Sequence, residues 1–186
     1  KYFIVGWMKQ FSELMCEMYS EHIDHPMSTV VIRPGNLYGP HDKFSWKESK
    51  VIPALIRRAI ERHNPFVVWG NGQDIKDFLY IDDFIEGLLL AFMESSQHEI
   101  FNIASGQPST INRLLTEVLE ATDYVDATIQ YDLTQPQMIP KRMINIERIK
   151  KRCGWSPRVC LSEGIERTVE WYRATYGSNA PEDFLA

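Results

Sequence analysis

The sequence predicts an α/β fold with a parallel sheet, and two observations carry this prediction. Short runs rich in β-branched and aromatic residues alternate along the chain with amphipathic helical segments, as they do where crossover helices join parallel strands. Loops containing glycine or proline follow several of these runs, which is typical of strands that end at one edge of a sheet. The 186 residues suffice for one domain, or two at most.

In the first half of the chain, strands are predicted at residues 30–32, 66–69 and 78–81, and helices at 7–22, 53–60 and from Asp82 or Asp83 to 92. Apolar residues of the first helix recur at spacings of three, one and three, which places them on one face. Pro53 fits the first turn of its helix, where a backbone N–H is not needed. Asp82 or Asp83 is suited to cap the third helix.

The second half repeats the alternation, with strands predicted at residues 99–103 and 128–131 and helices at 109–119, 146–153 and 161–177. Ser109 is a favourable N-cap for the first of these helices. Gly154 and Gly177 stand where the other two should end. The polar tail from Ser178 is expected to fray.

Composition excludes several classes of protein. Hydrophobic residues make up 44% and charged residues 24%, which excludes a disordered tail and a collagen-like repeat. The net charge of −5 argues against a nucleic-acid-binding surface. Three cysteines are too few for a disulfide framework or a closed metal site, so free thiols are expected. No apolar run reaches the ~20 residues of a membrane span, and the start lacks a signal-peptide pattern, so we expect a cytoplasmic protein without a membrane partner.

Two polar loops follow predicted strands and are candidates for ligand binding. The loop at 33–42 contains Asn36, which offers both a hydrogen-bond donor and an acceptor. The segment at 69–78 combines a Gly-x-Gly pair with Lys76, a mobile cation for an anionic group, and with Trp69, an indole that could cover a sugar or base. The alternatives are a structural turn for the first segment and a tight hairpin with a solvated lysine for the second.

The third candidate is the basic pair Lys141–Arg142, which follows a proline-containing loop. Arginine is suited to bidentate recognition of phosphate, although a basic pair is more often simply solvated. The Gly-x-Gly pair at 70–72 is not the dinucleotide-binding fingerprint, because it has no third glycine and leads into an extended segment.

Taken together, these segments resemble the C-terminal half of the extended short-chain dehydrogenase/reductase family, the NAD(P)-dependent nucleotide-sugar epimerases, dehydratases and reductases. The matching blocks, in order, are VIRPGNLYGPHDKF, VIPALIRRA, VVWGNGQDIKDFLYIDD, FNIASGQPSTI and GWSPRVCLSEGIERTVEWY. The likeness is greatest to the epimerase/reductase branch of the GDP-L-fucose synthase type; a 4-epimerase or a 4,6-dehydratase is the nearby alternative. The resemblance implies a truncated Rossmann-like parallel sheet with a smaller α/β substrate-binding subdomain.

The resemblance divides the chain into three parts. Residues 7–49 would form the end of the cofactor domain and 50–177 mostly the substrate-binding region, all within a single partial unit of 186 residues. Residues 1–6 look like a remnant of the first Rossmann strand. Nucleotide-sugar and NAD or NADP are the implied ligands, and self-association into a homo-oligomer is expected.

Individual site residues follow only from this resemblance. The cofactor's nicotinamide end would lie against Pro34, Gly35, Asn36 and Leu37, and Asn36 would also reach the substrate. The nucleotide diphosphate-sugar would contact Arg58, Trp69, Lys76 and Arg142. Lys76 replaces the family's usual arginine, so a bidentate phosphate contact is lost.

The catalytic residues of the family match this chain poorly. Lys9 stands at the lysine of the Tyr-x-x-x-Lys pair, but four residues earlier the chain has Val5, which cannot transfer a proton. Tyr2 is out of register with this pair. Lys50 stands where the epimerase/reductase branch has an acid/base histidine, and His41 does not match that position.

The glycine-rich cofactor fingerprint is also absent from the sequence. One hypothesis is an internal excision that joins the first strand directly to the catalytic helix. The alternative is a naturally shortened relative whose first six residues only look like that strand. In either case we expect these 186 residues to have no catalytic activity alone. A non-catalytic module that binds nucleotide-sugars or self-associates is the alternative of another class.

Overall fold

A computed structural model describes residues 3–135 and 139–177, and it has the expected α/β architecture with mostly parallel strand pairs. Parallel pairing joins β1 (Thr29–Pro34) to β6 (His98–Ile103), β2 (Asn36–Tyr38) to β5 (Phe78–Tyr80), and β3 (Phe66–Trp69) to β8 (Ile129–Asp132). The short strands β4 (Ile75–Lys76) and β7 (Ser109–Thr110) pair antiparallel. The predicted parallel α/β class is therefore confirmed.

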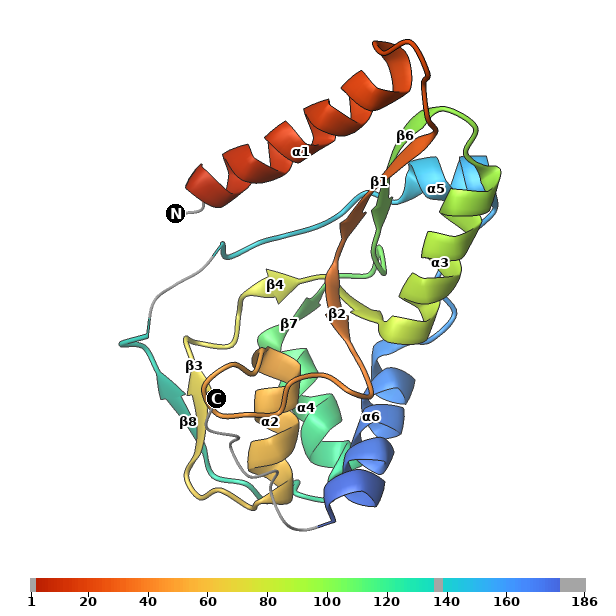
Figure 1. The fold of residues 1–186 in the computed structure, drawn as a ribbon. Coiled ribbons are helices and arrows are strands. Elements are labelled where there is room, and N and C mark those ends of the chain that lie inside the picture. The colour runs from red at the N-terminus through yellow and green to blue at the C-terminus, as the bar shows by residue number, and fades with distance from the viewer. Residues whose placement is uncertain (1–2, 136–138, 178–186) are drawn as a thin grey trace.

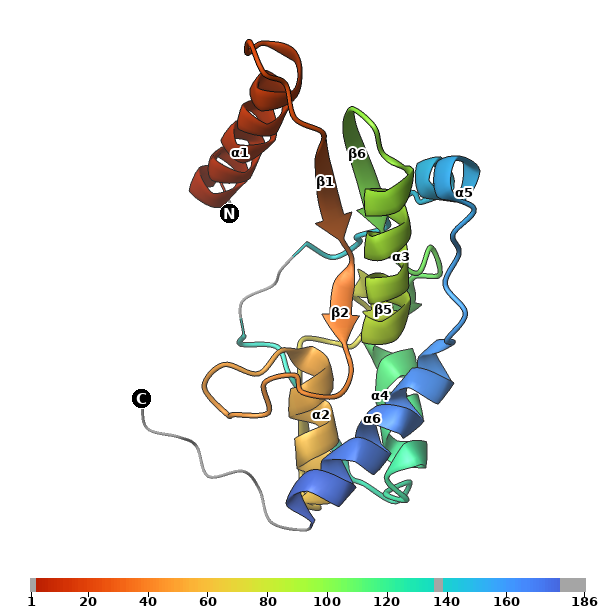
Figure 2. The same ribbon diagram turned by 45° about the vertical axis from the view of Figure 1, so that its right-hand side comes forward.

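The helices fall into two groups along the molecule (Figures 1 and 2). At one end, α2 (Val51–Ile60), α4 (Ile111–Ala121) and α6 (Leu161–Tyr176) gather into what we call the three-helix lobe. Beside the β1–β6 pair lie α3 (Ile81–Glu94) and α5 (Glu147–Cys153). Helix α1 (Phe3–Glu21) lies at the other end, away from the lobe, and contacts β1 and β6.

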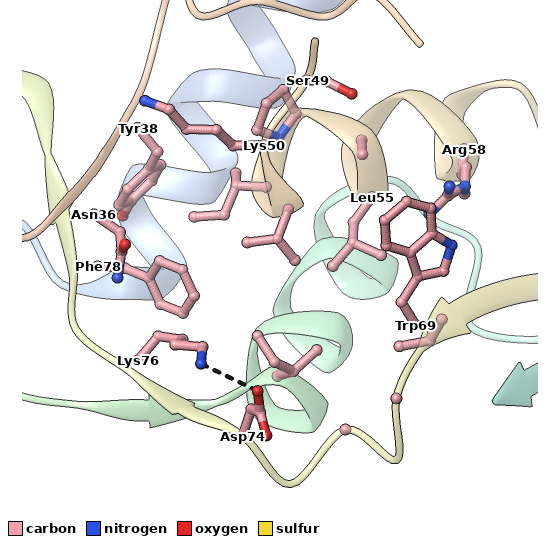
Figure 3. Close-up of a pocket in the computed structure, with 18 of the residues that line it drawn as sticks. Asn36, Tyr38, Ser49, Lys50, Leu55, Arg58, Trp69, Asp74, Lys76 and Phe78 are labelled. Atoms are coloured by element: carbon pink, nitrogen blue, oxygen red, sulfur yellow. Dashed lines mark hydrogen bonds and ion pairs between the residues drawn. The ribbon is translucent and has the colours of Figure 1, made fainter. Parts of the chain in front are cut away.

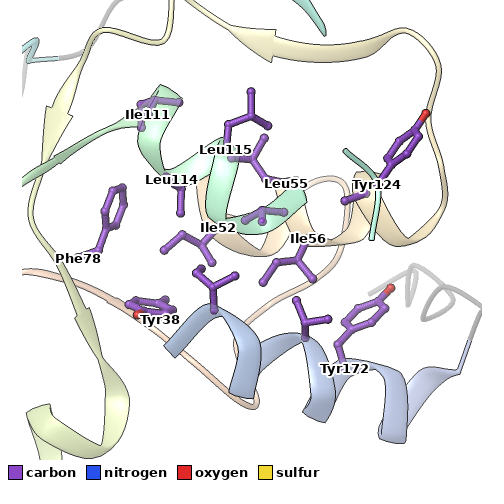
Figure 4. Close-up of a cluster of buried hydrophobic side chains, with 14 of the residues drawn as sticks. Tyr38, Ile52, Leu55, Ile56, Phe78, Ile111, Leu114, Leu115, Tyr124 and Tyr172 are labelled. Carbon is purple, nitrogen blue, oxygen red and sulfur yellow. The ribbon is translucent and has the colours of Figure 1, made fainter. Parts of the chain in front are cut away.

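A hydrophobic core fills the space between the helices of the three-helix lobe (Figure 4). Its members recur at helical spacing on the inward faces, as in Ile52, Leu55 and Ile56 of α2, Leu114, Leu115 and Val118 of α4, and Ile165, Val169 and Tyr172 of α6. A second core joins Phe101 and Ile103 of β6 to Ile149 and Trp155. The packed lobe is the scaffold on which the candidate site is built.

The N-terminal segment differs from its prediction as a strand. Residues 3–6 belong to α1, and Lys1 and Tyr2 lie outside the described residues. The strand prediction is therefore wrong for Phe3–Gly6, because no neighbouring strand pairs with them among the described residues, and a helix satisfies backbone N–H and C=O groups within the segment itself.

The loop predicted at 33–42 contains a short strand that the sequence pattern does not reveal. Strand β1 stops pairing with β6 after Pro34, although the Gly35 N–H still donates to the Ile103 carbonyl of β6 at 2.9 Å. The Asn36 N–H then donates to the Asp77 carbonyl, and β2 continues beside β5. Gly35 allows this change of partner, since a Cβ atom there would lie 3.2 Å from the Ala104 Cβ.

Some of the helix ends predicted from the sequence are confirmed and others are wrong. Gly154 ends α5 in the left-handed conformation, and Gly177 ends α6, as predicted. Thr110 caps α4 instead of Ser109, with its side-chain oxygen accepting from the Arg113 N–H.

The predicted cap of α3 is wrong as well, because the helix begins one residue before Asp82. The buried Asp83 carboxylate accepts hydrogen bonds from the backbone N–H groups of Arg158 and Val159. The tail from Ser178 lies outside the described residues. Within the described ranges, no helix combines the length and apolar character needed to cross a membrane.

Candidate functional site

A cavity of about 390 Å³ opens where β2, the start of α2 and the β3–β4 turn meet (Figure 3). This volume lies within the range of sites for small organic ligands. The cavity brings together six residues that the sequence singled out, namely Asn36, Leu37, Lys50, Arg58, Trp69 and Lys76. Lys50 and Lys76 lie toward one end of the cavity, and Arg58 and Trp69 toward the other (Figure 3).

Asn36 is fixed at its wall by two hydrogen bonds to one acceptor. Its backbone N–H and its side-chain Nδ2 donate to the Asp77 carbonyl at 2.9 and 2.8 Å. The Asp77 carboxylate is buried and accepts from the Ser105 N–H, the Ser105 hydroxyl and the Gly106 N–H. Asp77 thus holds the loops that follow β1 and β6 in one arrangement.

The β3–β4 turn forms another wall. Its two strands do not pair with each other, because β3 pairs with β8 and β4 with β7; the tight-hairpin alternative is therefore wrong. Gly72 has a φ of +75° and its carbonyl accepts from the Asn112 N–H at 2.9 Å. A Cβ atom at Gly72 would lie 1.7 Å from the Asn112 side chain, so the turn requires glycine. Trp69 is 61% exposed and leaves its indole accessible.

Three cations line the cavity with different surroundings. The Lys76 ammonium donates to the Asp74 carboxylate at 3.1 Å and to the Ile139 carbonyl. Arg58 donates to the Val67 carbonyl at 3.3 Å, and burial lowers the pKa of its guanidinium. Lys50 is exposed at the N-terminal end of α2. The site therefore has positive charge for an anionic ligand, together with one acidic group.

Two buried tyrosines lie at or beside the cavity, Tyr38 in its lining and Tyr80 against the Tyr38 ring. Burial raises the pKa of Tyr38, whose hydroxyl donates toward the Leu161 carbonyl at 3.5 Å at the start of α6. Burial also raises the pKa of Tyr80. Both phenols are therefore harder to ionise than a solvent-exposed tyrosine.

The other residues named from the sequence lie outside the lining of this cavity. Lys9 is exposed on α1, one turn after the exposed Val5. Pro34 is the last residue of β1. Gly35 follows it, at the point where the backbone changes its pairing from β6 to β5. Arg142 is exposed, and its backbone N–H donates to the Ile75 carbonyl beside β4.

Sequence reasoning missed Asp74, Trp46, Ser49 and Gln135, which also line the cavity. Asp74 had a usable signal, because residues two apart in an extended segment point to the same face, and Lys76 is two residues later. No sequence pattern pointed to Trp46, because this residue reaches the site from a loop. Its ring centroid lies 5.4 Å from the Arg58 guanidinium carbon.

A nicotinamide cofactor does not fit the residues of this chain as a complete site. The sequence contains no glycine-rich phosphate loop before a helix, and Lys9 has no tyrosine one turn earlier. One of the two N–H groups of the Asn36 side chain donates to the Asp77 carbonyl. We therefore derive no hydride-transfer step from these residues.

Known proteins similar to this chain agree with the geometry. It is 34% identical over 162 residues to a probable GDP-L-fucose synthase 1 of Oryza sativa subsp. japonica, covering 85% of this chain and 48% of that protein. It is 31% identical over 171 residues to the GDP-L-fucose synthase of Escherichia coli strain K12, covering 85% and 52%. The chain spans about half the length of the curated relatives it matches.

Among solved structures, a UDP-glucose 4-epimerase from Thermotoga maritima, determined with UDP-glucose, has a TM-score of 0.78 and 28% identity. The similarity covers 91% of this chain and 52% of that one, and it supports the Rossmann-like fold of extended short-chain dehydrogenase/reductase epimerases. The model of the NAD-dependent epimerase/dehydratase family matches residues 6–104, which is more than half of the chain. The chain therefore belongs to the NAD-dependent epimerase/dehydratase family.

Proposed function

We propose that this chain is the nucleotide-sugar-binding portion of an epimerase/reductase of the GDP-L-fucose synthase type. The observation that carries the proposal is the convergence of Lys50, Arg58, Trp69 and Lys76 on one cavity. Cations favour the diphosphate, and an accessible indole favours a flat base or sugar face. A GDP-linked sugar is the first candidate because curated relatives are named GDP-L-fucose synthases; a UDP-sugar, as in a 4-epimerase or 4,6-dehydratase relative, is the alternative.

The division of the chain follows from the same proposal. Residues 7–49 correspond to the end of a cofactor-binding domain, and residues 50–177 mostly to a substrate-binding region. NAD or NADP is the cofactor of the family, and the residues proposed to face it in a complete enzyme are Lys9, Pro34, Gly35, Asn36 and Leu37. Because the phosphate loop and the proton-transferring tyrosine are absent from the sequence, we expect no turnover of NAD(P)H by these 186 residues with GDP- or UDP-sugars.

Calorimetric titration with GDP-mannose and UDP-glucose tests the binding proposal. We expect saturable binding of one ligand per chain, weakened about tenfold or more by Trp69→Ala and by Lys76→Ala. Phe92→Ala is the matched aromatic control and Lys151→Ala the matched cation control, because both residues are exposed on helices outside the cavity. Equal losses in the controls, or no binding of either ligand by the unchanged protein, would reject the proposal.

A second candidate function, self-association, rests on α1. None of its 19 residues is buried, and Trp7, Phe11, Leu14 and Met18 form one exposed apolar stripe. We propose that a second copy of this chain covers the stripe, since residues at this spacing can interlock between two identical helices. Sedimentation equilibrium should show a dimer that Phe11→Glu with Leu14→Lys converts to a monomer. A monomeric unchanged protein, or dissociation instead by Leu89→Lys on α3, would exclude this interface.

A further inference from the structure

The indole of Trp46 lies against two consecutive arginines of α2. The Arg57 guanidinium carbon is 4.4 Å from the centroid of the Trp46 ring, and the Arg58 guanidinium carbon is 5.4 Å from it. Trp46 belongs to the loop between β2 and α2, and both Trp46 and Arg58 line the cavity. A guanidinium within about 6 Å of an indole ring is attracted by its π electrons. The loop therefore brings an aromatic ring to one cation of the candidate site.

Arg57 fixes the loop that carries Trp46. Its buried guanidinium donates from Nη1 to the Phe44 carbonyl at 2.8 Å and from Nε to the Glu61 carboxylate at 2.7 Å. Phe44 is itself buried in the lobe core, two residues before Trp46. These contacts hold the loop against α2, so the indole has its place before any ligand binds.

Hydrogen bonds hold Arg58 much less than Arg57. Its Nη1 donates to the Val67 carbonyl at 3.3 Å, which is the one hydrogen bond of this side chain within the described part of the protein. A guanidinium has five N–H donors. An indole attracts the cation through its π electrons and does not neutralise it as a carboxylate would, so the charge and the other N–H groups remain available to an anion.

A restraint on Arg58 that leaves its donors available should strengthen ligand binding. A long arginine side chain has many rotamers, and fixing one of them on a ligand costs conformational entropy. An aromatic ring beside the guanidinium limits these rotamers in advance and reduces that cost. Arg58 lies toward the same end of the cavity as Trp69 (Figure 3), so the restrained cation is close to the accessible indole.

We infer that Trp46 is a positioning residue, whose indole holds the Arg58 guanidinium ready for an anionic group of a ligand in the cavity. The inference rests on the proposed nucleotide-sugar site and deepens it, because it names what prepares one of the cations of that site. Trp46 acts through Arg58 and needs no contact of its own with the ligand.

A double-mutant cycle, titrated with GDP-mannose and UDP-glucose, tests this role. For the ligand that binds, Trp46→Leu should lower the affinity about fivefold, and Trp46→Phe, which keeps an aromatic face, by less than about twofold. In an Arg58→Gln background, Trp46→Leu should cause no further loss, because the group that it positions is gone. Trp171→Leu is the matched control, because Trp171 is also a half-buried tryptophan of the lobe but lies outside the cavity lining.

NMR relaxation of the Arg58 Nε–H group in the ligand-free protein gives a second readout that does not depend on binding. Its order parameter should fall in Trp46→Leu and stay unchanged in Trp46→Phe and Trp171→Leu, with the fold of each variant checked by circular dichroism. An unchanged order parameter in Trp46→Leu, or an equal loss of affinity with and without Arg58, would show that the positioning role is wrong while the proposed function stands. If the unchanged protein binds neither ligand, the proposed function and this inference both fail.

Discussion

The three-helix lobe and helix α1 both arise from amphipathic sequence, but their apolar faces meet different surroundings. Within the lobe, α4 buries Ile111, Leu114, Leu115 and Val118 among the neighbouring helices. Helix α1 buries none of its 19 residues and contacts β1 and β6 (Figure 2). An amphipathic pattern thus predicts a helix but not its partner. Since the cavity lies on the lobe side, its shape depends on the packed region and not on α1.

The largest predicted effect is on the free energy of unfolding, and it comes from comparing one phenylalanine substitution in each region. Phe66 is fully buried in the lobe core, whereas Phe11 on α1 is 64% exposed. Phe66→Ala should lower the free energy of unfolding by about 3–5 kcal/mol, because it removes buried surface and leaves a cavity. Phe11→Ala should change it by less than about 0.5 kcal/mol. Urea unfolding followed by circular dichroism measures both, and equal losses would show that α1 is packed as tightly as the lobe.

The next effect concerns Asp77, which joins the loops that follow β1 and β6. Asp77 accepts three hydrogen bonds from Ser105 and Gly106 after β6, and its carbonyl holds Asn36 after β1. Asp77→Asn should cost about 2 kcal/mol of unfolding free energy, because an amide cannot accept at both positions and turns an N–H toward the Gly106 N–H. Asp123→Asn, on an exposed carboxylate, serves as the control. If Asp77→Asn lowers the unfolding free energy no more than Asp123→Asn does, this role of Asp77 is contradicted.

The last effect leaves stability at pH 7 unchanged and appears only at alkaline pH, where a buried tyrosine of the lobe titrates. Burial raises the pKa of Tyr172 to about 12, above the ordinary value of 10. Between these two pH values the unfolded chain releases the proton while the folded chain keeps it, so stability should fall as the pH rises from about 10 to 12. The Tyr172 hydroxyl has no hydrogen-bond partner in the described part of the chain. Tyr172→Phe should therefore preserve stability at pH 7 and reduce the alkaline loss; an identical pH profile for both proteins would contradict the assignment.

Sequence periodicity predicted the elements whose apolar faces are buried by the chain itself. The helices around Leu55, Leu114 and Val169 were predicted from their spacing, and Gly154 and Gly177 marked two helix ends. The strand at 36–38 was not predicted. It has only three residues, and its pairing with β5 depends on a partner 42 positions later in the chain, as in Asn36 with Phe78. Local patterns carry no information on such a distant partner.

Some of the residues singled out from the sequence line one cavity, but Lys9, Pro34, Gly35 and Arg142 do not, and the electrostatics of the cavity were not predicted. Asn36, Lys50, Arg58, Trp69 and Lys76 converge on one cavity, although they come from separate loops and helices. The ion pair that Lys76 makes with Asp74 depends on rotamers and on the fixed β3–β4 turn, which a sequence pattern does not specify. The reading of residues 3–6 as a strand failed because their β-branched composition does not supply a neighbouring strand.

Hydrogen exchange of the full chain, with and without GDP-mannose or UDP-glucose, tests the central claim most directly. The account predicts that one of these ligands slows amide exchange in the segments 50–58 and 69–76, which supply much of the cavity lining, and leaves exchange in α1 unchanged. Unchanged exchange at the cavity with both ligands, or a response confined to α1, would contradict a nucleotide-sugar site built on the three-helix lobe.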